Sequence, residues 1–144
     1  ARLLPNEHFN IITNAVNIAQ EIIDKNKISV VMLGGTLNRN TLSVSGPSAI
    51  SSIDRINLEL AFMSASAFTI DAGFTVSNVY EAELKRKVIN KAKKSFMLMD
   101  TSKIGKDLMY TLANFEDIDV LITETADLPE EIITFSAQKN IKII

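Results

Sequence analysis

Four charged residues in the middle of the sequence have the types and spacing of an anion site. Glu81 and Lys85 are four positions apart, and in a helix this spacing places both side chains on one face, where they can pair or contact a ligand together. Asp100 and Lys103 follow an apolar run at positions 96–99. Because two of the four groups are cations, the constellation predicts a binding site for an anionic ligand.

The apolar pattern at 95–99 predicts a strand that ends just before Asp100 and Lys103. Every residue after Ser95 in this run is apolar, which favours a strand buried on both faces of a sheet. In open α/β sheets, ligands bind beyond the carboxyl ends of the strands, where loops lie beside helix amino termini. We therefore expect Asp100 and Lys103 at such an edge, with Gly73 as a hinge before the preceding helix.

The helix that carries Glu81 and Lys85 is predicted by apolar residues at helical spacing. Tyr80, Leu84 and Val88 recur every four positions and should face the core. The charged pair lies on the neighbouring face of the same helix. This arrangement would hold both side chains at a fixed distance from the end of the following strand.

The same residues also permit a purely structural interpretation. Asn78 and Glu81 have the spacing of a capping box, in which the Glu side chain binds the backbone N–H of the cap. Glu81 and Lys85 also match an ordinary surface pair worth roughly 0.2–0.5 kcal/mol. Asp100 has the right chemistry to cap the next turn. Residue types alone leave both interpretations open, and the shared position at a strand end favours a site.

The rest of the chain alternates between strand and helix patterns. Strands are predicted at 9–13, 28–33, 60–63, 120–123 and 141–144, and helices at 16–24, 47–53 and 129–138. Asn14 is the expected N-cap of the first helix. Residues 36–45 are a loop or an edge strand, and residues 64–73 are a loop of small residues. Repeated βα units of this length predict one α/β domain over residues 1–144, with a mainly parallel, doubly wound sheet in three α/β/α layers.

Composition excludes several classes of function. The 144 residues include no cysteine and a single histidine, which makes a zinc site improbable. The net charge of −2 gives no electrostatic footprint for nucleic acid, and no apolar run reaches the length of a membrane helix. No dinucleotide or Walker phosphate motif is present, so no cofactor is expected. The opening Ala-Arg-Leu-Leu-Pro resembles the last turn of a helix, which suggests a piece of a longer protein.

An ordered set of short motifs runs through nearly the whole chain. It comprises Val31 to Gly35, Gly46, Ala61-Phe62, Gly73-Phe74-Thr75, Asn78-x-x-Glu81-Ala82-x-x-Lys85, Asp100-x-Ser102-Lys103 and Leu121-Ile122-Thr123. This set resembles the effector-binding domain of DeoR-type transcriptional regulators of sugar metabolism. The resemblance implies a fold like that of ribose-5-phosphate isomerase and CoA transferases. It also implies a cytoplasmic, homo-oligomeric regulator that binds a phosphorylated sugar and contacts DNA only through a separate winged helix-turn-helix domain.

By the resemblance, the ligand-binding residues form two sets. One set lies beside the phosphate loop of the family and lets the backbone approach the ligand: Thr13, Asn14, Gly34, Gly35 and Gly46. The other set shapes the opposite wall and supplies the charged groups: Gly73, Thr75, Asn78, Glu81, Lys85, Asp100 and Lys103. In these roles Glu81 accepts hydrogen bonds from sugar hydroxyls, the two lysines offset anionic charge, and Asp100 accepts a hydroxyl or holds Lys103. No residue is assigned to catalysis or to a metal.

Some positions depart from the family pattern, and two other functions stay open. The family usually has glycine at Ser64 and Ala67 and aspartate at Glu59 and Glu124, and its first strand and phosphate loop would precede Ala1. A carboxylate and a lysine in one crevice are also compatible with a sugar-phosphate isomerase or a CoA-transferase-like enzyme. The third possibility is an oligomerisation module without a ligand.

Overall fold

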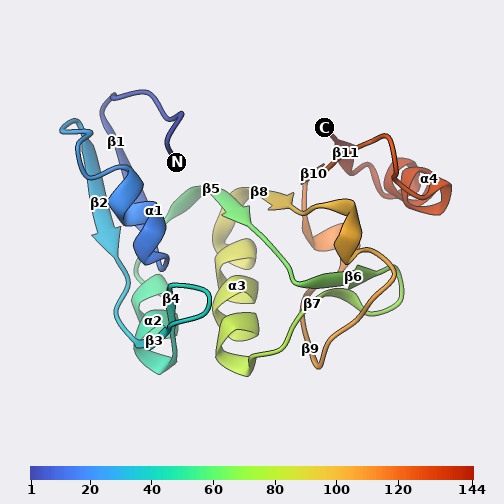
Figure 1. Cartoon of the computed structure of the whole chain (residues 1–144), viewed down its shortest axis with the longest axis horizontal. Helices are drawn as coiled ribbons and strands as arrows, with labels where there is room; N and C mark the ends of the chain where they lie inside the picture. The colour runs from blue at the N-terminus through green and yellow to red at the C-terminus, as the bar shows by residue number, and fades with distance from the viewer. The chain divides into compact units, whose positions relative to one another are not determined.

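The computed structural model describes all 144 residues, which form two compact units, Ala1–Arg55 and Ile56–Ile144. Figure 1 labels the elements. The first unit contains β1 (Phe9–Thr13), α1 (Val16–Glu21), β2 (Ile28–Met32), β3 (Thr36–Asn38), β4 (Ser43–Ser45) and α2 (Pro47–Ile53). The second contains β5 (Leu58–Met63), β6 (Ala67–Thr69), β7 (Gly73–Val76), α3 (Val79–Lys91), β8 (Ala92–Leu98), η1 (Thr101–Lys103), β9 (Tyr110–Ala113), η2 (Phe115–Asp117), β10 (Val120–Ile122), α4 (Glu130–Lys139) and β11 (Lys142–Ile143).

The first unit is built on one βαβ motif. Strands β1 and β2 pair in parallel, from Phe9 opposite Ile28 to Thr13 opposite Met32, with α1 between them in the sequence. Residues 36–45 form the antiparallel hairpin of β3 and β4, which settles the choice between a loop and an edge strand. Because β1 and β2 end at paired residues, the segments that follow them begin at the same edge.

The start of α1 differs from the sequence prediction. Ala15, not Asn14, is the N-cap residue, and no side chain caps the helix. The Asn14 side chain instead donates from Nδ2 to the carbonyl oxygen of Val44 at 2.9 Å, and the Asn14 carbonyl accepts from the Val44 N–H at 2.8 Å. The predicted cap is wrong because this amide is engaged by a strand 30 residues away, which local sequence cannot reveal.

A parallel four-stranded sheet organises the second unit. Its strand order is β11-β10-β8-β5, and all three pairs of neighbours run in the same direction. Helix α3 precedes β8 in the sequence, and α4 joins β10 to β11. The mixed α/β fold with a parallel sheet is therefore confirmed, and the strands and helices at 120–144 lie within about two residues of their predicted positions.

A second sheet in this unit was not expected from the sequence. Strands β6, β7 and β9 form an antiparallel sheet, with Phe68 opposite Phe74. The predicted loop at 64–73 is therefore wrong, since it contains β6. A strand of three residues is too short for its alternation to show in the sequence, and its pairing with β7 decides its conformation.

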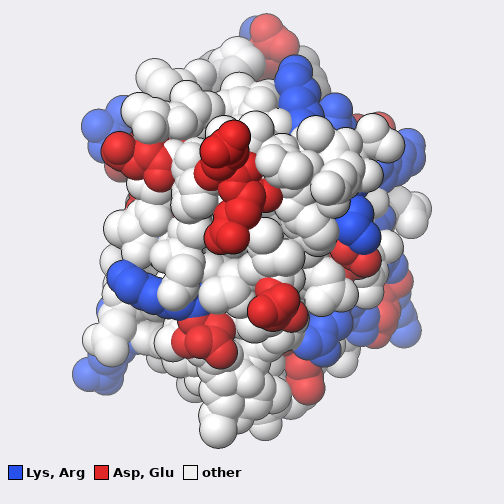
Figure 2. All heavy atoms as spheres, turned by 90° about the vertical axis from the view of Figure 1, so that its right-hand side faces the viewer, with Lys and Arg blue, Asp and Glu red and all other residues white.

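Charged side chains of both signs are interspersed on the face of the protein that Figure 2 shows. That face carries no continuous basic surface of the kind that neutralises a nucleic-acid backbone. The longest helix, α3, has 13 residues, and no helix combines the length and the apolar character that a membrane span requires.

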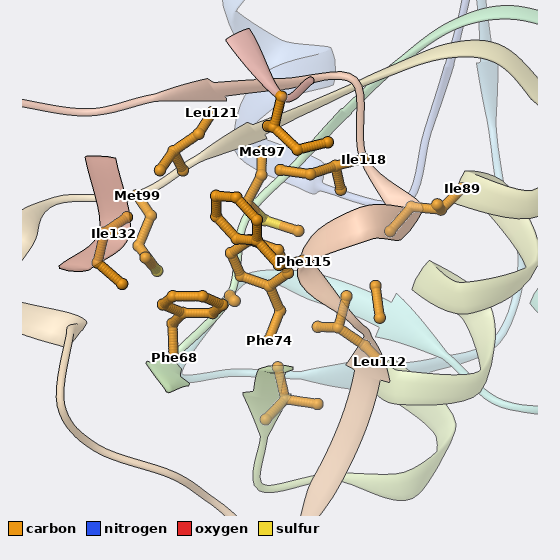
Figure 3. Packing of buried hydrophobic residues seen from close by; sticks show 14 of the residues in the cluster. Phe68, Phe74, Ile89, Met97, Met99, Leu112, Phe115, Ile118, Leu121 and Ile132 are labelled. Carbon is orange, nitrogen blue, oxygen red and sulfur yellow. The ribbon is translucent and has the colours of Figure 1, made fainter. Parts of the chain in front are cut away.

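The core of the second unit is centred on three phenylalanines (Figure 3). The ring centroid of Phe68 lies 4.5 Å from that of Phe74 and 5.3 Å from that of Phe115. Aromatic pairs at such distances contribute about 0.5–1.5 kcal/mol beyond the burial of their area. Met97 and Met99 are buried in the same cluster. This core fixes the position of β8, whose carboxyl end carries the predicted site.

Two details of α3 and β8 correct the sequence predictions. Tyr80 is 45% exposed and does not face the core, whereas Ala82, Leu84 and Ile89 are buried. Leu98 in β8 is 40% exposed, so this strand is not buried on both faces. A short apolar run in the sequence occurs both in strands that are covered on one face and in strands that are covered on two. The packing of the rest of the chain decides which of the two the strand becomes.

Candidate functional site

The twelve predicted site residues are divided between the two units. Thr13, Asn14, Gly34, Gly35 and Gly46 lie in the first unit, and the other seven lie in the second. In the first unit, Thr13 ends β1, and its hydroxyl accepts a hydrogen bond from the Ala15 N–H at 3.1 Å. Its carbonyl accepts from the Leu33 N–H at 2.8 Å, just before the glycine pair. The structure therefore brings Thr13, Asn14 and the two glycines together at one end of the β1–β2 pair.

The glycines of the first unit serve different purposes. Gly35 has a φ of +148°, and a Cβ there would lie 2.5 Å from the carbonyl oxygen of Ser45. This glycine is required by the close approach of β4, whatever binds to the protein. Gly34 and Gly46 have no atom within 4 Å of a built Cβ, so no neighbour in the chain requires a glycine's small size there. Gly46 has a φ of +119°, which by itself favours glycine, so Gly34 is the better candidate for a place where a ligand approaches the backbone.

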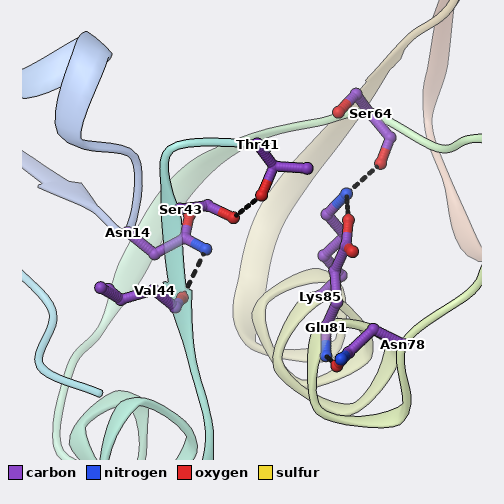
Figure 4. Close-up of polar contacts among 8 residues, drawn as sticks. All are labelled: Asn14, Thr41, Ser43, Val44, Ser64, Asn78, Glu81 and Lys85. Carbon is purple, nitrogen blue, oxygen red and sulfur yellow. Dashed lines mark hydrogen bonds and ion pairs between the residues drawn. The ribbon is translucent and has the colours of Figure 1, made fainter. Parts of the chain in front are cut away.

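In the second unit, the charged pair on α3 is closely held. Lys85 Nζ contacts Glu81 Oε1 at 2.7 Å and also donates to the carbonyl oxygen of Ser64 at 2.7 Å. Figure 4 shows the ammonium group between these two acceptors. Asn78 caps the helix by accepting from the Glu81 N–H at 3.1 Å. The capping box is only half formed, because the Glu81 carboxylate pairs with Lys85.

These contacts assign a structural part to Lys85. Its side chain is only 16% exposed, and its charge is offset by Glu81. The bond to Ser64 fastens the segment after β5 to α3. The pair therefore links the carboxyl end of β5 to the helix, and Lys85 has less freedom than an exposed lysine to reach an anion.

Gly73 and Thr75 make packing contacts and hydrogen bonds within the second unit. Gly73 has a φ of +72°, and a Cβ there would lie 2.4 Å from the carbonyl oxygen of Ala113. Thr75 is fully buried, and its hydroxyl accepts from the Leu108 N–H at 2.9 Å and donates to the carbonyl oxygen of Ala67. Both residues hold the β6-β7-β9 sheet together, and their contact with a ligand stays a prediction.

Asp100 and Lys103 form the most accessible charged pair of the predicted set. They lie at the two ends of a short turn after β8, with Lys103 Nζ 3.2 Å from Asp100 Oδ2. The Ser102 hydroxyl donates to the other carboxylate oxygen. The Lys103 side chain is 33% exposed, about twice as much as that of Lys85. This turn therefore presents a cation at the carboxyl end of a central strand, where ligands bind in open α/β sheets.

The neighbours of Asp100 favour its charged form. The hydrogen bond from Ser102, followed by the one from Lys103, lowers the pKa of Asp100 from its ordinary value of 3.8. A carboxyl group whose pKa is lower in the folded state stabilises the fold above its ordinary pKa, and this contribution is lost as the pH falls through the lowered value. Asp100 is therefore ionised at neutral pH and able to accept a hydroxyl or to hold Lys103.

The hollows of the surface do not coincide with these residues. A hollow of about 420 Å³ in the first unit is lined by side chains of α1 and β2, nearly all apolar. A hollow of about 280 Å³ in the second unit lies between Asp71, Gly105 and Glu131. Neither is lined by a predicted site residue, so the polar groups at the strand ends, not the hollows, mark the candidate site.

Comparison with known proteins identifies the family. The model of the DeoR C terminal sensor domain matches residues 1–125. The chain belongs to this family of DeoR sensor domains. The match includes all twelve predicted site residues and crosses the boundary between the two compact units.

Similar proteins are regulators of transcription. The DeoR sensor chain is 36% identical to the HTH-type transcriptional regulator GolR of Listeria innocua over 79% of this chain and 45% of the relative. It is 36% identical to GlpR of Haloferax volcanii, over 84% of this chain and 48% of that regulator. It is 25% identical to the glycerol-3-phosphate regulon repressor of Haemophilus influenzae, over 99% of this chain and 54% of the repressor. The chain thus spans about half the length of these relatives.

The Asp100–Lys103 turn of this DeoR sensor chain is held in place by residues that the sequence did not indicate. Thr101 N–H donates to Glu124 Oε2 at 3.1 Å, and Lys106 Nζ donates to the carbonyl oxygen of Ser102 at 2.9 Å. Gly105 N–H donates to the carbonyl oxygen of Phe68 at 2.9 Å. Only Glu124 carried a signal in the sequence, as a departure from the family pattern, and that signal did not reveal its partner.

Proposed function

We propose that this chain is the ligand-sensing part of a bacterial-type transcriptional repressor of carbohydrate metabolism and binds a phosphorylated sugar. The observation that carries the proposal is the Asp100–Lys103 turn at the carboxyl end of β8, in a chain of the DeoR sensor family. It combines a partly exposed cation for a phosphate with an ionised acceptor for a hydroxyl. One of the similar proteins is named as a repressor of the glycerol-3-phosphate regulon, which agrees with a phosphorylated effector.

The charged residues of the second unit have distinct roles in this proposal. Lys103 offsets the charge of the phosphate, Asp100 accepts a sugar hydroxyl, and Glu81 accepts a second one while Lys85 holds its carboxylate in place. Considered by itself, the first unit offers the polar side chains of Thr13 and Asn14 beside the open backbone of Gly34 and Gly46, while Gly35 allows the close approach of β4. We treat residues 1–144 as one sensor domain, because the family match continues across the two compact units.

We propose that the sensor controls a separate DNA-binding domain of a cytoplasmic homo-oligomer. The relatives are HTH-type regulators about twice as long as the matched region, which leaves room for such a domain in them. The fold proposed for the complete sensor is the three-layer arrangement that resembles ribose-5-phosphate isomerase and CoA transferases. Binding of the sugar phosphate then changes DNA affinity, because the ligand has different affinities for the two states of the protein.

A thermal-shift screen of the full-length regulator tests the proposal. The screen uses glucose 6-phosphate, fructose 6-phosphate, glycerol 3-phosphate and other phosphorylated sugars, with the unphosphorylated sugars and inorganic phosphate as controls. A ligand at 100 times its Kd stabilises the protein by about 2.7 kcal/mol. We expect at least one phosphorylated sugar to raise the melting temperature well beyond its unphosphorylated counterpart. No shift with any member of a broad panel would contradict phosphosugar sensing.

We expect the full-length regulator not to convert any of the common pentose or hexose phosphates. The relatives are transcriptional regulators, although a carboxylate beside a lysine also suits an isomerase that moves a proton next to a carbonyl. Coupled assays over the same panel measure this. Turnover above about 1 s⁻¹, at the low end of ordinary enzyme rates, would favour the enzyme if Glu81→Gln or Asp100→Asn abolished it.

A further inference from the structure

The turn that carries Asp100 and Lys103 is capped by Glu124, which lies just after a different strand, β10. Asp100 occupies the N-cap position of η1, but its side chain makes no capping hydrogen bond. Its carboxylate instead binds the Ser102 hydroxyl and Lys103. The N–H at the start of the turn, that of Thr101, donates to Glu124 Oε2 at 3.1 Å. Glu124 thus supplies an acceptor for the first N–H of the turn, whereas an N-cap side chain accepts from the second or third N–H.

Strand pairing explains how Glu124 reaches the turn. Strands β8 and β10 are parallel neighbours, with Leu98 opposite Ile122. Asp100 and Glu124 each lie two residues beyond that pair, so they follow the two strands at the same edge of the sheet. The Glu124 carboxylate is then close enough to bind the first N–H of the turn, and the Asp100 carboxylate holds Lys103.

The charge of Glu124 is unfavourable for an anion site, which makes its presence informative. A carboxylate near a bound phosphate repels it, so charge alone does not suit this residue to the position. Its hydrogen bond to Thr101 gives it a use that does not depend on charge. A glutamine at this position keeps an acceptor oxygen and removes the charge, which separates the two effects.

We propose that Glu124 is a positioning residue of the ligand site, which orients Asp100 and Lys103 by capping their turn. This inference rests on the proposed function, because it takes the turn as a part of the site. Removing the acceptor leaves the Thr101 N–H to water and lets the turn adopt other conformations. Ligand affinity falls because part of the binding energy is then used to order the turn.

The test is a set of variants of the full-length regulator, titrated by calorimetry with the tightest sugar phosphate of the panel and with inorganic phosphate. Glu124→Ala is expected to weaken binding about 5- to 10-fold, as for the loss of one hydrogen bond. Glu124→Gln keeps the acceptor and is expected to bind within about 2-fold of the wild type or more tightly. Glu124→Asp, which is one methylene shorter, is expected to resemble the alanine variant.

A double-mutant cycle with Lys103 identifies the route of the effect. If Glu124 acts through the turn, Glu124→Ala has little effect on affinity once Lys103→Ala is present. Hydrogen exchange gives a readout that needs no ligand, because the Thr101 amide should exchange faster in Glu124→Ala than in Glu124→Gln. Equal affinity of the wild type and Glu124→Ala, or unchanged exchange at Thr101, would overturn the positioning role. Loss of affinity in Glu124→Gln as large as in Glu124→Ala would also overturn it.

Failure of the proposed function would give a different result. In that case Lys103→Ala binds every probe as the wild type does, or no probe binds at all. If Lys103→Ala weakens binding and Glu124→Ala does not, the site stands and only the positioning role falls.

Discussion

Replacing Lys103 by alanine is expected to weaken sugar-phosphate binding by about 1.5–3 kcal/mol, the range for hydrogen bonds to charged groups. This corresponds to roughly 10- to 150-fold in Kd. Lys103 is a better probe than Lys85, because Lys85 is held by Glu81 and by the Ser64 carbonyl. The free energy of unfolding should change by less than about 1 kcal/mol, because the partly exposed Lys103 pairs only with a surface carboxylate, Asp100. Calorimetry on the full-length regulator and a denaturation curve measure the two quantities.

Lys93 provides a matched control at the other end of the same strand. It lies near the start of β8, 79% exposed, and pairs weakly with Glu59 at 3.8 Å. Lys93→Ala removes the same charge from the same unit and should leave ligand affinity unchanged. Equal affinity of the wild type and Lys103→Ala for the effector would remove Lys103 from the site. Equal losses in both variants would mean that only net charge matters.

Replacing Gly73 by alanine is expected to lower the free energy of unfolding by about 2–4 kcal/mol. The residue has a φ of +72°, which costs a non-glycine residue about 1–2 kcal/mol. A Cβ at this position would also lie 2.4 Å from the carbonyl oxygen of Ala113, so β7 and β9 would have to move apart. Both tyrosines, Tyr80 and Tyr110, belong to the second unit and the chain has no tryptophan, so tyrosine fluorescence follows the unfolding of this unit in urea.

A substitution at Gly105 separates the cost of the positive φ from the cost of the contact with Ala113. Its φ is +77°, close to that of Gly73, but no atom lies within 4 Å of a built Cβ. Gly105→Ala should therefore show only the backbone cost of about 1–2 kcal/mol. The difference between the two variants measures the contact with Ala113. If both variants lose the same stability, that contact does not constrain the β7–β9 pair.

Local patterns in the sequence determined most of the elements of this protein. The runs at 9–13, 28–33 and 120–123 are rich in β-branched residues and became β1, β2 and β10 with small shifts at their ends, because these side chains suit the extended backbone of a strand. The Asn78 cap of α3 was also predictable, since its acceptor and the Glu81 N–H are three residues apart. The ordered motifs indicated the DeoR family, which the match over residues 1–125 shows.

Contacts between distant residues decided what the site residues do. The family resemblance suggested that Gly73 and Thr75 face a ligand, which stays a prediction, and only the structure shows that Ala113 crowds Gly73 and that Leu108 binds Thr75. The contact of Lys85 with an anion also stays a prediction, and its hydrogen bond to the carbonyl of Ser64, 21 residues earlier, could not be read from the sequence. In the sequence, Glu124 is only a departure from the aspartate of the family pattern. The structure shows that it binds Thr101 in the turn. The periodicity of apolar residues in the sequence indicates which residues face the core. Each of these hydrogen bonds joins segments that are far apart in the chain and become adjacent only after the strands have paired.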